Sequence, residues 1–398
     1  MHIAQVSPYF HPHLGGVESH VMDICQELRR RGHDLTVVTS SEDGNAREEW
    51  IRGLRVLRSR SFLTLFRSPV TPAMARDLRG VEADLYHAHI PSPLPAYFAA
   101  RASETTGVPL LITYHCDSEI RGPWGPPVLG LYHRTLGAYT MERAAGVITT
   151  TQTYAATSRA VWDQNTMVIP NPVDVRRFHP DTSPGQVRAR HGIPEDEPLV
   201  LFVGRLVPHK GTEYLLRAMP GLPAHLLIVG TGPREPLLRK MATLPTLRDK
   251  VHFAGRVSSR ELPQYYAACD LSVLPSTSRL EAFGIAALEA MASGKPVIVS
   301  DVPGVREVIE EGREGLQIDP IDAEDIAAKI RILLADESLR KEMGHRAREK
   351  VELHFSLTAV VDRLEALYGR FTRQRSRDRD PPCDPTHAKR LRHRGGPR

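Results

Sequence analysis

The sequence predicts an α/β protein made of two doubly wound, parallel-sheet domains that face each other across a cleft. Short apolar runs alternate with amphipathic helical stretches along most of the 398 residues. Many of these runs are apolar on both faces, as buried parallel strands are. The length suits two domains of roughly 100–200 residues each. A stretch rich in Pro and charge at 171–198 divides the alternation into two halves of similar design.

The first half, residues 1–180, is predicted to form a Rossmann-like domain. Residues 16–31 should form a helix, because apolar side chains recur three or four positions apart from Val17 to Leu28. The strands that we expect in this half are Ile3–Ser7, Leu35–Thr39, Ala83–His89, Leu110–His115, Val147–Thr151 and Met167–Pro170.

The second half, residues 195–354, is predicted to be a second Rossmann-like domain. It follows a linker that holds one short helix. Residues 355–371 form a last amphipathic helix, FSLTAVVDRLEALYGRF. The strands that we expect in this half are Leu199–Gly204, Leu226–Gly230, Val251–Gly255, Leu271–Pro275, Val297–Ser300 and Leu316–Asp319. In such folds, ligands bind at the carboxyl ends of the strands.

The charge of the chain is concentrated at its carboxyl end. The whole chain has a formal net charge of +5, whereas residues 372–398 hold nine Lys or Arg and three Asp, a net of +6. This segment has almost no apolar residues, so we expect a disordered basic tail. It is either a solvated tail without a partner or an electrostatic arm toward an anionic membrane surface or another polyanion. No nucleic-acid partner is expected.

Nothing in the sequence indicates export or insertion into a membrane. No apolar stretch approaches the roughly 20 residues that span a bilayer, and the first residues lack the basic start and apolar run of a signal peptide. We therefore expect a cytoplasmic protein, either free or peripheral at the inner face of the plasma membrane. Free thiols are expected rather than disulfides or a zinc site, because no CxxC pair occurs among Cys25, Cys116, Cys269 and Cys383.

Two glycine-containing turns are candidates for binding an anion. Gly15 and Gly16 stand between the first predicted strand and the first predicted helix, where free N–H groups and partial positive charge attract anions. A tight turn without a ligand is the alternative. In the second half, Arg205 follows Gly204 at the end of a strand, and Lys210 comes five residues later. Two cations at the mouth of a sheet suit a diphosphate; a solvated charge pair is the alternative.

The segment EAFGIAALE, from Glu281 to Glu289, carries the most specific pattern. Gly284 is expected to begin a helix, so that Glu281 lies in the preceding loop and Glu289 lies inside the helix. Eight helical steps span roughly 12 Å, which lets one carboxylate reach a sugar and the other a ribose, as acidic residues do in dinucleotide folds. Two solvated surface glutamates are the alternative, which their apolar neighbours disfavour: Phe283, Ile285, Leu288 and Met291.

His115 ends a predicted strand in LLITYHCDSE, and the neighbouring run contributes His87 and His89. A histidine at the carboxyl end of a strand faces the expected cleft, although a lone histidine can equally be structural. Asp117 and Glu119 follow His115 in sequence. Either carboxylate is a candidate base or nucleophile.

The order of these motifs resembles glycosyltransferase family 4, whose members are retaining enzymes of the GT-B fold. The resemblance covers about residues 1–370, and the Glu-x7-Glu element is its most specific part. The matching segments are GGVESHV (15–21), RGHDLTVVTS (31–40), HAH (87–89), YHCD (114–117), IPNPVD (169–174), FVGRLVPHKG (202–211), VGTGP (229–233), VHFAGRV (251–257) and EAFGIAALEAMASGKPVI (281–298).

The resemblance implies a nucleotide-sugar donor that binds between the domains. The backbone of Gly15 and Gly16 would contact its diphosphate, which Arg205 and Lys210 would also hold. His115 would contact the sugar near the reacting carbon. We count His115, Arg205 and Lys210 among the expected catalytic residues.

Two glutamates would fix the donor's hydroxyl groups. Glu281, also counted as catalytic, would contact the transferred sugar, and Glu289 would contact the ribose. The last helix would cross back onto the first domain. The remaining expected donor-binding residues are Gly255, Arg256 and Val257, beside the nucleobase, and Phe283, Gly284 and Ile285, beside Glu281.

The family's usual mechanism is attack on the same face of the sugar that the leaving phosphate departs from. The implied reaction moves a hexosyl group from a UDP- or GDP-sugar to a saccharide or lipid-linked acceptor, in polysaccharide or glycolipid assembly at the cell surface. No cofactor and no metal are expected. One departure from the family's Gly-Gly-x-x-Glu stands at Pro303 to Glu307, where only Gly304 and Glu307 are kept. Trp124, in a Pro-rich segment, is expected either in an acceptor- or membrane-facing loop or in the packed core.

Two other functions remain open at this point. A nucleotide-sugar epimerase or hydrolase of the same fold would turn the donor over without an acceptor. A catalytically silent nucleotide-sugar-binding protein is the other alternative, which the complete set of charged site residues disfavours.

Overall fold

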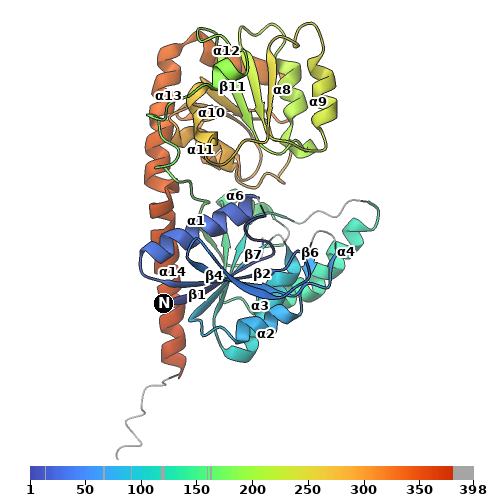
Figure 1. Cartoon of the computed structure of the whole chain (residues 1–398), viewed down its shortest axis with the longest axis vertical. Coiled ribbons are helices and arrows are strands. Elements are labelled where there is room, and N and C mark those ends of the chain that lie inside the picture. Colours follow the sequence, from blue (N-terminus) through green and yellow to red (C-terminus); the bar gives the residue numbers. More distant parts are fainter. Residues whose placement is uncertain are drawn as a thin grey trace, which may run out of the picture.

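The computed structural model describes residues 1–13, 15–65, 68–90, 92–117, 122–158, 160–161 and 164–379, the last six of these by their backbone alone. It shows two lobes, one above the other in Figure 1, with long helices running along one side of both. No helix in these described ranges has the length and apolar character needed to cross a bilayer.

The N-terminal domain is built on an eight-stranded sheet with the order β10-β9-β8-β7-β1-β2-β4-β3, parallel except where β3 meets β4. Its elements are β1 (His2–Ser7), α1 (Gly16–Arg30), β2 (Asp34–Ser40), β3 (Arg47–Ile51), β4 (Leu54–Ser59), β5 (Leu63–Leu65), β6 (Ser68–Val70), α2 (Ala73–Arg79), β7 (Leu85–Ile90), α3 (Pro93–Thr106), β8 (Leu110–Tyr114), α4 (Gly125–Tyr132), η1 (His133–Gly137), α5 (Ala138–Glu142), β9 (Gly146–Thr149), α6 (Gln152–Thr157) and β10 (Thr166–Val168).

Helices cover both faces of this sheet, as in a doubly wound fold. Alternate residues of β1 enter different cores: Ala4 packs with α2 and α3, whereas Ile3 packs with α1. All six predicted strands of this half are present. The short strands β5 and β6 were not predicted, and neither were β3 and β4. They form a hairpin that turns at Arg52 and Gly53, both with positive φ, as two-residue hairpin turns require.

The C-terminal domain is built on a six-stranded parallel sheet with the order β13-β12-β11-β14-β15-β16, and all six strands were predicted. Its elements are α7 (Val187–Arg190), β11 (Leu199–Val203), η2 (Pro208–Lys210), α8 (Thr212–Ala218), β12 (His225–Val229), α9 (Glu235–Ala242), β13 (Val251–Gly255), α10 (Leu262–Ala268), β14 (Leu271–Leu274), α11 (Ile285–Ala292), β15 (Val297–Ser300), η3 (Arg306–Val308), β16 (Gly315–Ile318), α12 (Ala323–Ala335), α13 (Glu337–Lys350) and η4 (Val351–Phe355). The expected short helix of the linker is α7.

The chain crosses between the domains twice, and the two crossings pair with each other. The backbone N–H of Val173 donates to the carbonyl of Phe355 at 2.8 Å, and that of Leu357 donates to the carbonyl of Val173 at 3.1 Å. The second crossing leads into α14 (Leu357–Arg379), which runs down the N-terminal domain in Figure 1. Tyr368 and its apolar neighbours on α14 enter the core shared with α1.

The predicted end of this last helix was wrong. The sequence predicted a helix over 355–371 and a disordered tail over 372–398, whereas α14 continues to Arg379. Arg and Gln are good helix formers, so the existing helix can propagate beyond its last apolar residue. The rest of the predicted tail, residues 380–398, lies outside the described residues.

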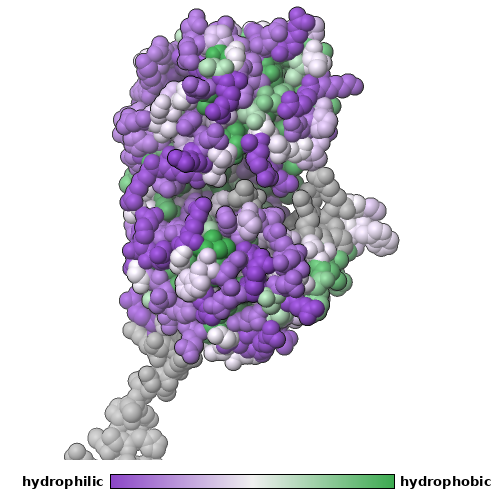
Figure 2. Space-filling model, viewed as in Figure 1, coloured by the Kyte–Doolittle hydropathy of each residue, from purple (hydrophilic) through white to green (hydrophobic). Residues whose placement is uncertain are grey.

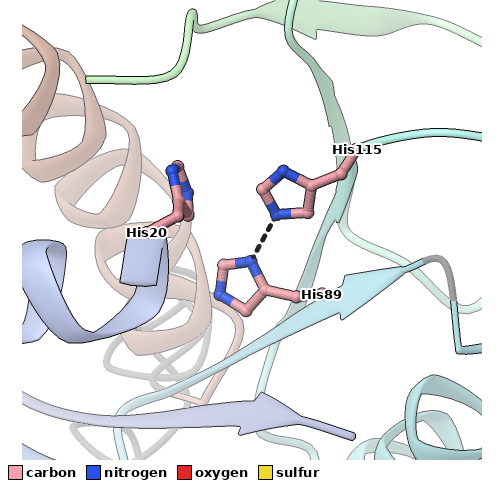
Figure 3. Close-up of side chains that lie close together, drawn as sticks. All are labelled: His20, His89 and His115. Atoms are coloured by element: carbon pink, nitrogen blue, oxygen red, sulfur yellow. Dashed lines mark hydrogen bonds between the residues drawn. The ribbon is translucent and has the colours of Figure 1, made fainter. Parts of the chain in front are cut away.

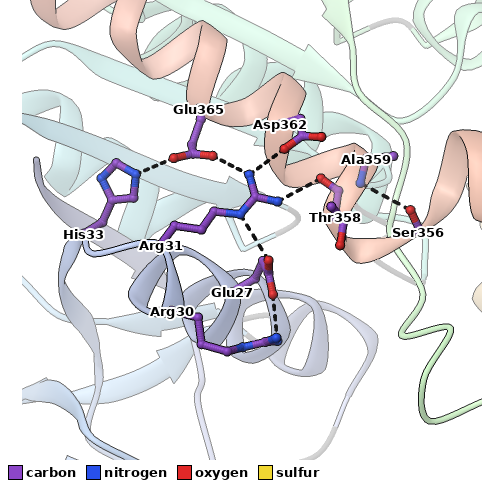
Figure 4. Close-up of polar contacts among 9 residues, drawn as sticks. All are labelled: Glu27, Arg30, Arg31, His33, Ser356, Thr358, Ala359, Asp362 and Glu365. Atoms are coloured by element: carbon purple, nitrogen blue, oxygen red, sulfur yellow. Dashed lines mark hydrogen bonds and ion pairs between the residues drawn. The ribbon is translucent and has the colours of Figure 1, made fainter.

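Charged contacts fix α14 to α1 (Figure 4). Arg31, just after α1, donates to Asp362 at 2.6 Å and also to Glu365, and its Nε donates to Glu27 at 3.1 Å. His33 contacts the second oxygen of Glu365 at 2.6 Å. One guanidinium thus joins the end of α1 to two carboxylates on successive turns of α14, which holds the crossing helix in register on the N-terminal domain.

Candidate functional site

A cavity of about 380 Å³ lies between the two domains, at the carboxyl ends of the central strands. The centre of each sheet is the point where the strand order reverses, because β1 lies between β2 and β7, and β11 lies between β12 and β14. Ligands of doubly wound folds bind at such a point. The predicted residues that line the cavity are Gly15, Gly16, Arg205, Arg256, Val257, Ile285 and Glu289.

The N-terminal domain contributes the turn between β1 and α1. Gly15 precedes α1 in an extended conformation and provides no side-chain cap. The Glu18 carboxylate folds back over this turn and accepts from the Glu18 backbone N–H in the first turn of the helix. Gly15 and Gly16 both line the cavity. A Cβ on Gly16 would lie 3.8 Å from Cδ1 of Ile285 on the opposite domain. The two domains therefore approach each other closely at the backbone of Gly16.

The C-terminal domain contributes a cation on the opposite wall. Arg205 follows β11, is exposed, and makes no ion pair with any residue that the structure describes. Its positive charge opposes the rise in the pKa of Glu18 that burial causes. A cation and a helix N-terminus on one cavity suit an anionic ligand, and the carboxylate now at this helix start is that of Glu18.

Lys210 and Glu281 contact each other in an ion pair. Their side chains are only 15% and 11% exposed, and neither lines the cavity. Lys210 folds back over Gly204, whose added Cβ would lie 3.6 Å from the Lys210 Nζ atom. Two residues that were predicted to contact different parts of one ligand therefore neutralise each other here.

The predicted geometry around Gly284 is confirmed. Gly284 precedes α11 with φ of 86°, Glu281 lies in the turn before it, and Glu289 lies in the second turn of the helix. The left-handed conformation favours glycine. Phe283 needs a correction, because its side chain is 4% exposed and packs on Phe355 with ring centroids 6.0 Å apart. This aromatic side chain belongs to the core and can approach a ligand only through its backbone.

Gly255 lies beside the cavity without lining it. It ends β13 with φ of 65°, and its carbonyl accepts from the Gly230 N–H at 2.8 Å. The next residues, Arg256 and Val257, reach the cavity. Of the segment predicted to lie beside the nucleobase, the last two residues therefore line the cavity.

Glu289 lies among charges that the sequence analysis missed. It accepts from the Tyr266 hydroxyl at 2.8 Å, and burial raises its pKa to about 7 although that contact and Arg177 lower it. Asp23 of α1 also lines the cavity, and burial raises its pKa to about 6. Asp23 stands two helical turns after Gly16, which places both on one face of α1. The spacing of Gly16 and Asp23 is the sequence pattern from which Asp23 could have been predicted to face the cavity.

His115 lies at the carboxyl end of β8, as predicted, and is 7% exposed. It is one of three buried histidines (Figure 3): its Nε2 is 3.0 Å from the Nδ1 of His89, and its ring lies edge-on to that of His20 with centroids 4.7 Å apart. Burial lowers the pKa of His115 to about 4. The imidazole is therefore neutral at physiological pH.

The Asp117 carboxylate is already fully engaged. It accepts from the Ser158 hydroxyl at 2.6 Å and the Tyr114 hydroxyl at 3.0 Å, and it pairs with Arg279 of the other domain at 3.0 Å. These contacts leave it poorly placed as a base or nucleophile and make it an interdomain contact. Glu119, the other candidate, lies outside the described residues.

Glu307, which is kept in the altered Gly-Gly-x-x-Glu segment, also joins the domains. Its carboxylate accepts from the backbone N–H groups of Gln152 and Thr153, both at 3.0 Å, at the start of α6. Gly304 has φ of 96°, and an added Cβ would overlap the carbonyl oxygen of Ala282. The retained pair therefore maintains the contact between the lobes.

Trp124 is 78% exposed, which excludes the core position that the sequence left open. Leu131, on the helix that Trp124 precedes, is 66% exposed. Figure 2 shows hydrophobic side chains gathered over α4 at the edge of the N-terminal lobe.

Two family models match this chain. Residues 14–177 match the model described as Glycosyltransferase Family 4, and residues 185–350 match Glycosyl transferases group 1. The chain is a family 4 glycosyltransferase. A sulfoquinovosyl transferase from Arabidopsis thaliana is 30% identical to this glycosyltransferase. The match covers 87% of the present chain and 69% of the relative. A GDP-mannose-dependent phosphatidylinositol monomannoside mannosyltransferase from Mycobacterium tuberculosis is 29% identical, over 89% of this chain and 94% of the relative.

Solved structures give the same fold for this glycosyltransferase. A sucrose-phosphate synthase from Thermosynechococcus elongatus matches with a TM-score of 0.75 and 25% identity, over 93% of this chain and 98% of the other. The HepE protein of Anabaena, in complex with UDP, also matches with a TM-score of 0.75. Its identity is 23%, over 93% of this chain and 100% of the other. The predicted GT-B fold and the predicted transferase activity are confirmed.

Proposed function

We propose that this glycosyltransferase moves a hexosyl group from a UDP- or GDP-sugar to a saccharide or lipid-linked acceptor, with retention of anomeric configuration, in cell-surface polysaccharide or glycolipid assembly. The observation that carries the donor proposal is Arg205, which has no ion-pair partner among the described residues and lines the same cavity as the Gly15–Gly16 turn before α1. A diphosphate supplies the anion for both walls, and Glu289 in the same cavity is available to a ribose.

Donor binding exchanges the partners of Lys210 and Glu281. In the ligand-free chain the two side chains pair with each other. A diphosphate draws Lys210 toward its oxygens, and the released Glu281 accepts from hydroxyls of the transferred sugar. Both charges are then used by the ligand, so their desolvation is compensated in either state.

Transfer proceeds by departure of the nucleotide diphosphate and attack of the acceptor on the same face. Arg205, Lys210 and the N–H groups of Gly15 and Gly16 stabilise the charge that develops on the leaving phosphate. That phosphate takes the acceptor's proton. Neutral His115 contacts the sugar near the reacting carbon. Glu281 is paired and Asp117 is engaged, which favours this route over a covalent one, and no metal or cofactor is needed for it.

The acceptor binds on the N-terminal domain. A hollow of about 490 Å³ beside the β1–α1 turn is lined by Tyr9, His13, Glu42 and Phe62, among others. Aromatic faces and carboxylates are groups that bind sugar rings and hydroxyls. The mycobacterial mannosyltransferase is named for a phosphatidylinositol monomannoside acceptor, which supports a glycolipid acceptor. The Arabidopsis relative is named for the sulfoquinovosyl group that it transfers, which supports a hexosyl donor.

The test begins with thermal shifts of the full chain against UDP- and GDP-sugars. The stabilising donor is then incubated with candidate acceptors, and the anomeric configuration of the product is determined by NMR. We expect retention, and loss of transfer in Glu281→Ala; unfolding of that variant without donor measures what the lost pair with Lys210 costs the fold. An inverted product or undiminished transfer by that variant would refute the proposal. Rapid donor turnover without any acceptor would favour the epimerase or hydrolase instead.

A further inference from the structure

Three histidines from separate parts of the N-terminal domain form one buried cluster (Figure 3). His20 comes from α1, His89 from β7 and His115 from the end of β8, and they are 8%, 1% and 7% exposed. One ring nitrogen from each lies within 4.8 Å of the other two. Hydrogen bonding within the cluster accounts for only some of these nitrogens.

The hydrogen bonds fix which nitrogens carry protons. The Gln5 Oε1 atom can only accept, so His89 donates to it through Nε2, at 2.8 Å. Neutral His89 therefore has its lone pair on Nδ1, and His115 donates its Nε2 proton to that lone pair at 3.0 Å. One proton therefore lies between the Nε2 of His115 and the Nδ1 of His89.

One buried polar atom of the cluster, the Nδ1 of His20, has no hydrogen-bond partner in the described part of the chain. Buried polar atoms are rarely left unpaired, and each one calls for an explanation. The Asn171 side chain lies next to His115 and hydrogen-bonds its ring, so it can hold the His115 proton at Nδ1. A ligand that uses the histidine lone pairs would satisfy the His20 nitrogen.

We propose that His20, His89 and His115 form a binding site for a divalent transition metal ion such as Zn²⁺ or Co²⁺. Three imidazoles with one open position are an established zinc arrangement, with Zn–N distances of about 2.0–2.1 Å. His89 already donates its other N–H to Gln5, the orientation that metal-bound histidines need. The contact distances in the cluster close by side-chain shifts alone, on the order of 1 Å.

The protons of the cluster can be accounted for without loss. A neutral imidazole offers one lone pair to a ligand. The His115 proton moves from Nε2 to Nδ1, on the side of the Asn171 side chain, and the ion replaces the hydrogen bond between His89 and His115.

The fourth position of the ion faces the interdomain cavity, because His20 lines that cavity. Metal binding removes His115 from the sugar, so the ion acts as an inhibitor of transfer. This consequence rests on the proposed function, whereas binding itself does not. The site also leaves unchanged the proposal that transfer needs no metal.

The experiment titrates chelator-treated full-length chain with ZnCl₂ by calorimetry, without sugars. We expect one Zn²⁺ per chain, and at least a 10-fold weaker affinity in His20→Ala and in His89→Gln, in line with the about 10–100-fold losses seen when metal sites are perturbed. The matched control is His252→Gln. His252 contacts His225 at 2.9 Å, much as His89 contacts His115, but that pair lies outside the three-histidine group.

Co²⁺ gives a second readout that tests geometry and does not depend on the variants folding well. The wild-type chain should show the strong visible absorption of four-coordinate Co²⁺, and Zn²⁺ should displace it. The absence of this band, no saturable Zn²⁺ binding, or equal losses in His252→Gln would each overturn the site. Zn²⁺ that binds without slowing transfer would overturn the inhibition. A chain that binds Zn²⁺ but transfers no sugar would refute the proposed function alone.

Discussion

Replacing Glu289 by Gln should make the protein more stable at neutral pH while weakening its hold on the nucleoside. Burial raises the pKa of this carboxyl from its ordinary 4.5 to about 7, so the folded state binds its proton more tightly than the unfolded state does. The stability of the native chain therefore falls as pH rises from about 4.5 to about 7 and stays reduced above that range. Gln keeps the contact with Tyr266 and has no charge to bury.

The size of the effect follows from the pKa shift. Each pKa unit corresponds to about 1.36 kcal/mol, so the full shift of Glu289 is worth about 3 kcal/mol at pH 8. Because its side chain is partly exposed, which weakens the effect through solvent screening, we expect about 1–2 kcal/mol. For domains of this size that is a Tm increase of about 2–8 °C. The lost charged hydrogen bonds to ribose should weaken nucleotide binding by about 10–100-fold.

The assay compares unfolding of the two proteins from pH 5 to pH 8 and measures nucleotide affinity at pH 8. Glu195→Gln, at a side chain that is 82% exposed, is the control and should change neither quantity. A stability gain that does not grow with pH would refute the pKa argument. Unchanged nucleotide affinity would refute the assignment of Glu289 to the ribose.

Three further substitutions test other contacts. Gly304→Ala must place a Cβ against the Ala282 carbonyl at φ of 96°, so we expect a loss of about 1–3 kcal/mol; chemical unfolding that shows no loss would contradict this. Lys210→Met should lower kcat/KM by about 100-fold, and an unchanged steady-state rate would remove Lys210 from the site. Arg31→Ala should lower stability by about 1–3 kcal/mol because its contacts with α14 are lost, and an unaltered urea midpoint would show that these contacts are incidental.

Most of the fold could be predicted because its strands are apolar on both faces. The helix that contains Glu289 could also be predicted from the sequence, because Gly284 marks its start. The hairpin of β3 and β4 was missed because REEWI and LRVLRS carry many charges. The edge strand β3 tolerates them because much of it is exposed, and β4 combines its arginines with buried apolar residues. The end of α14 was misplaced because apolar content measures what a helix buries rather than how far it extends.

The sequence predicted many residues of the site but not which of them contact each other. Glycines and cations at strand ends can be read from local sequence, but the contact between Lys210 and Glu281 joins two loops that are far apart in the chain. The same holds for Arg177 beside Glu289, and for the three buried histidines. Such contacts depend on how strands are ordered within a sheet and on how the two lobes meet, neither of which has a local signature.

The central claim is that the cavity between the lobes holds a diphosphate. The most direct test measures the affinity of the full chain for a nucleoside diphosphate and for the matching monophosphate, in the wild type and in Arg205→Ala. We predict that the wild type prefers the diphosphate by at least about 10-fold, the value of one charge-assisted contact, and that Arg205→Ala loses most of this preference. Equal affinities in the wild type, or a preference that persists in the variant, would contradict the claim.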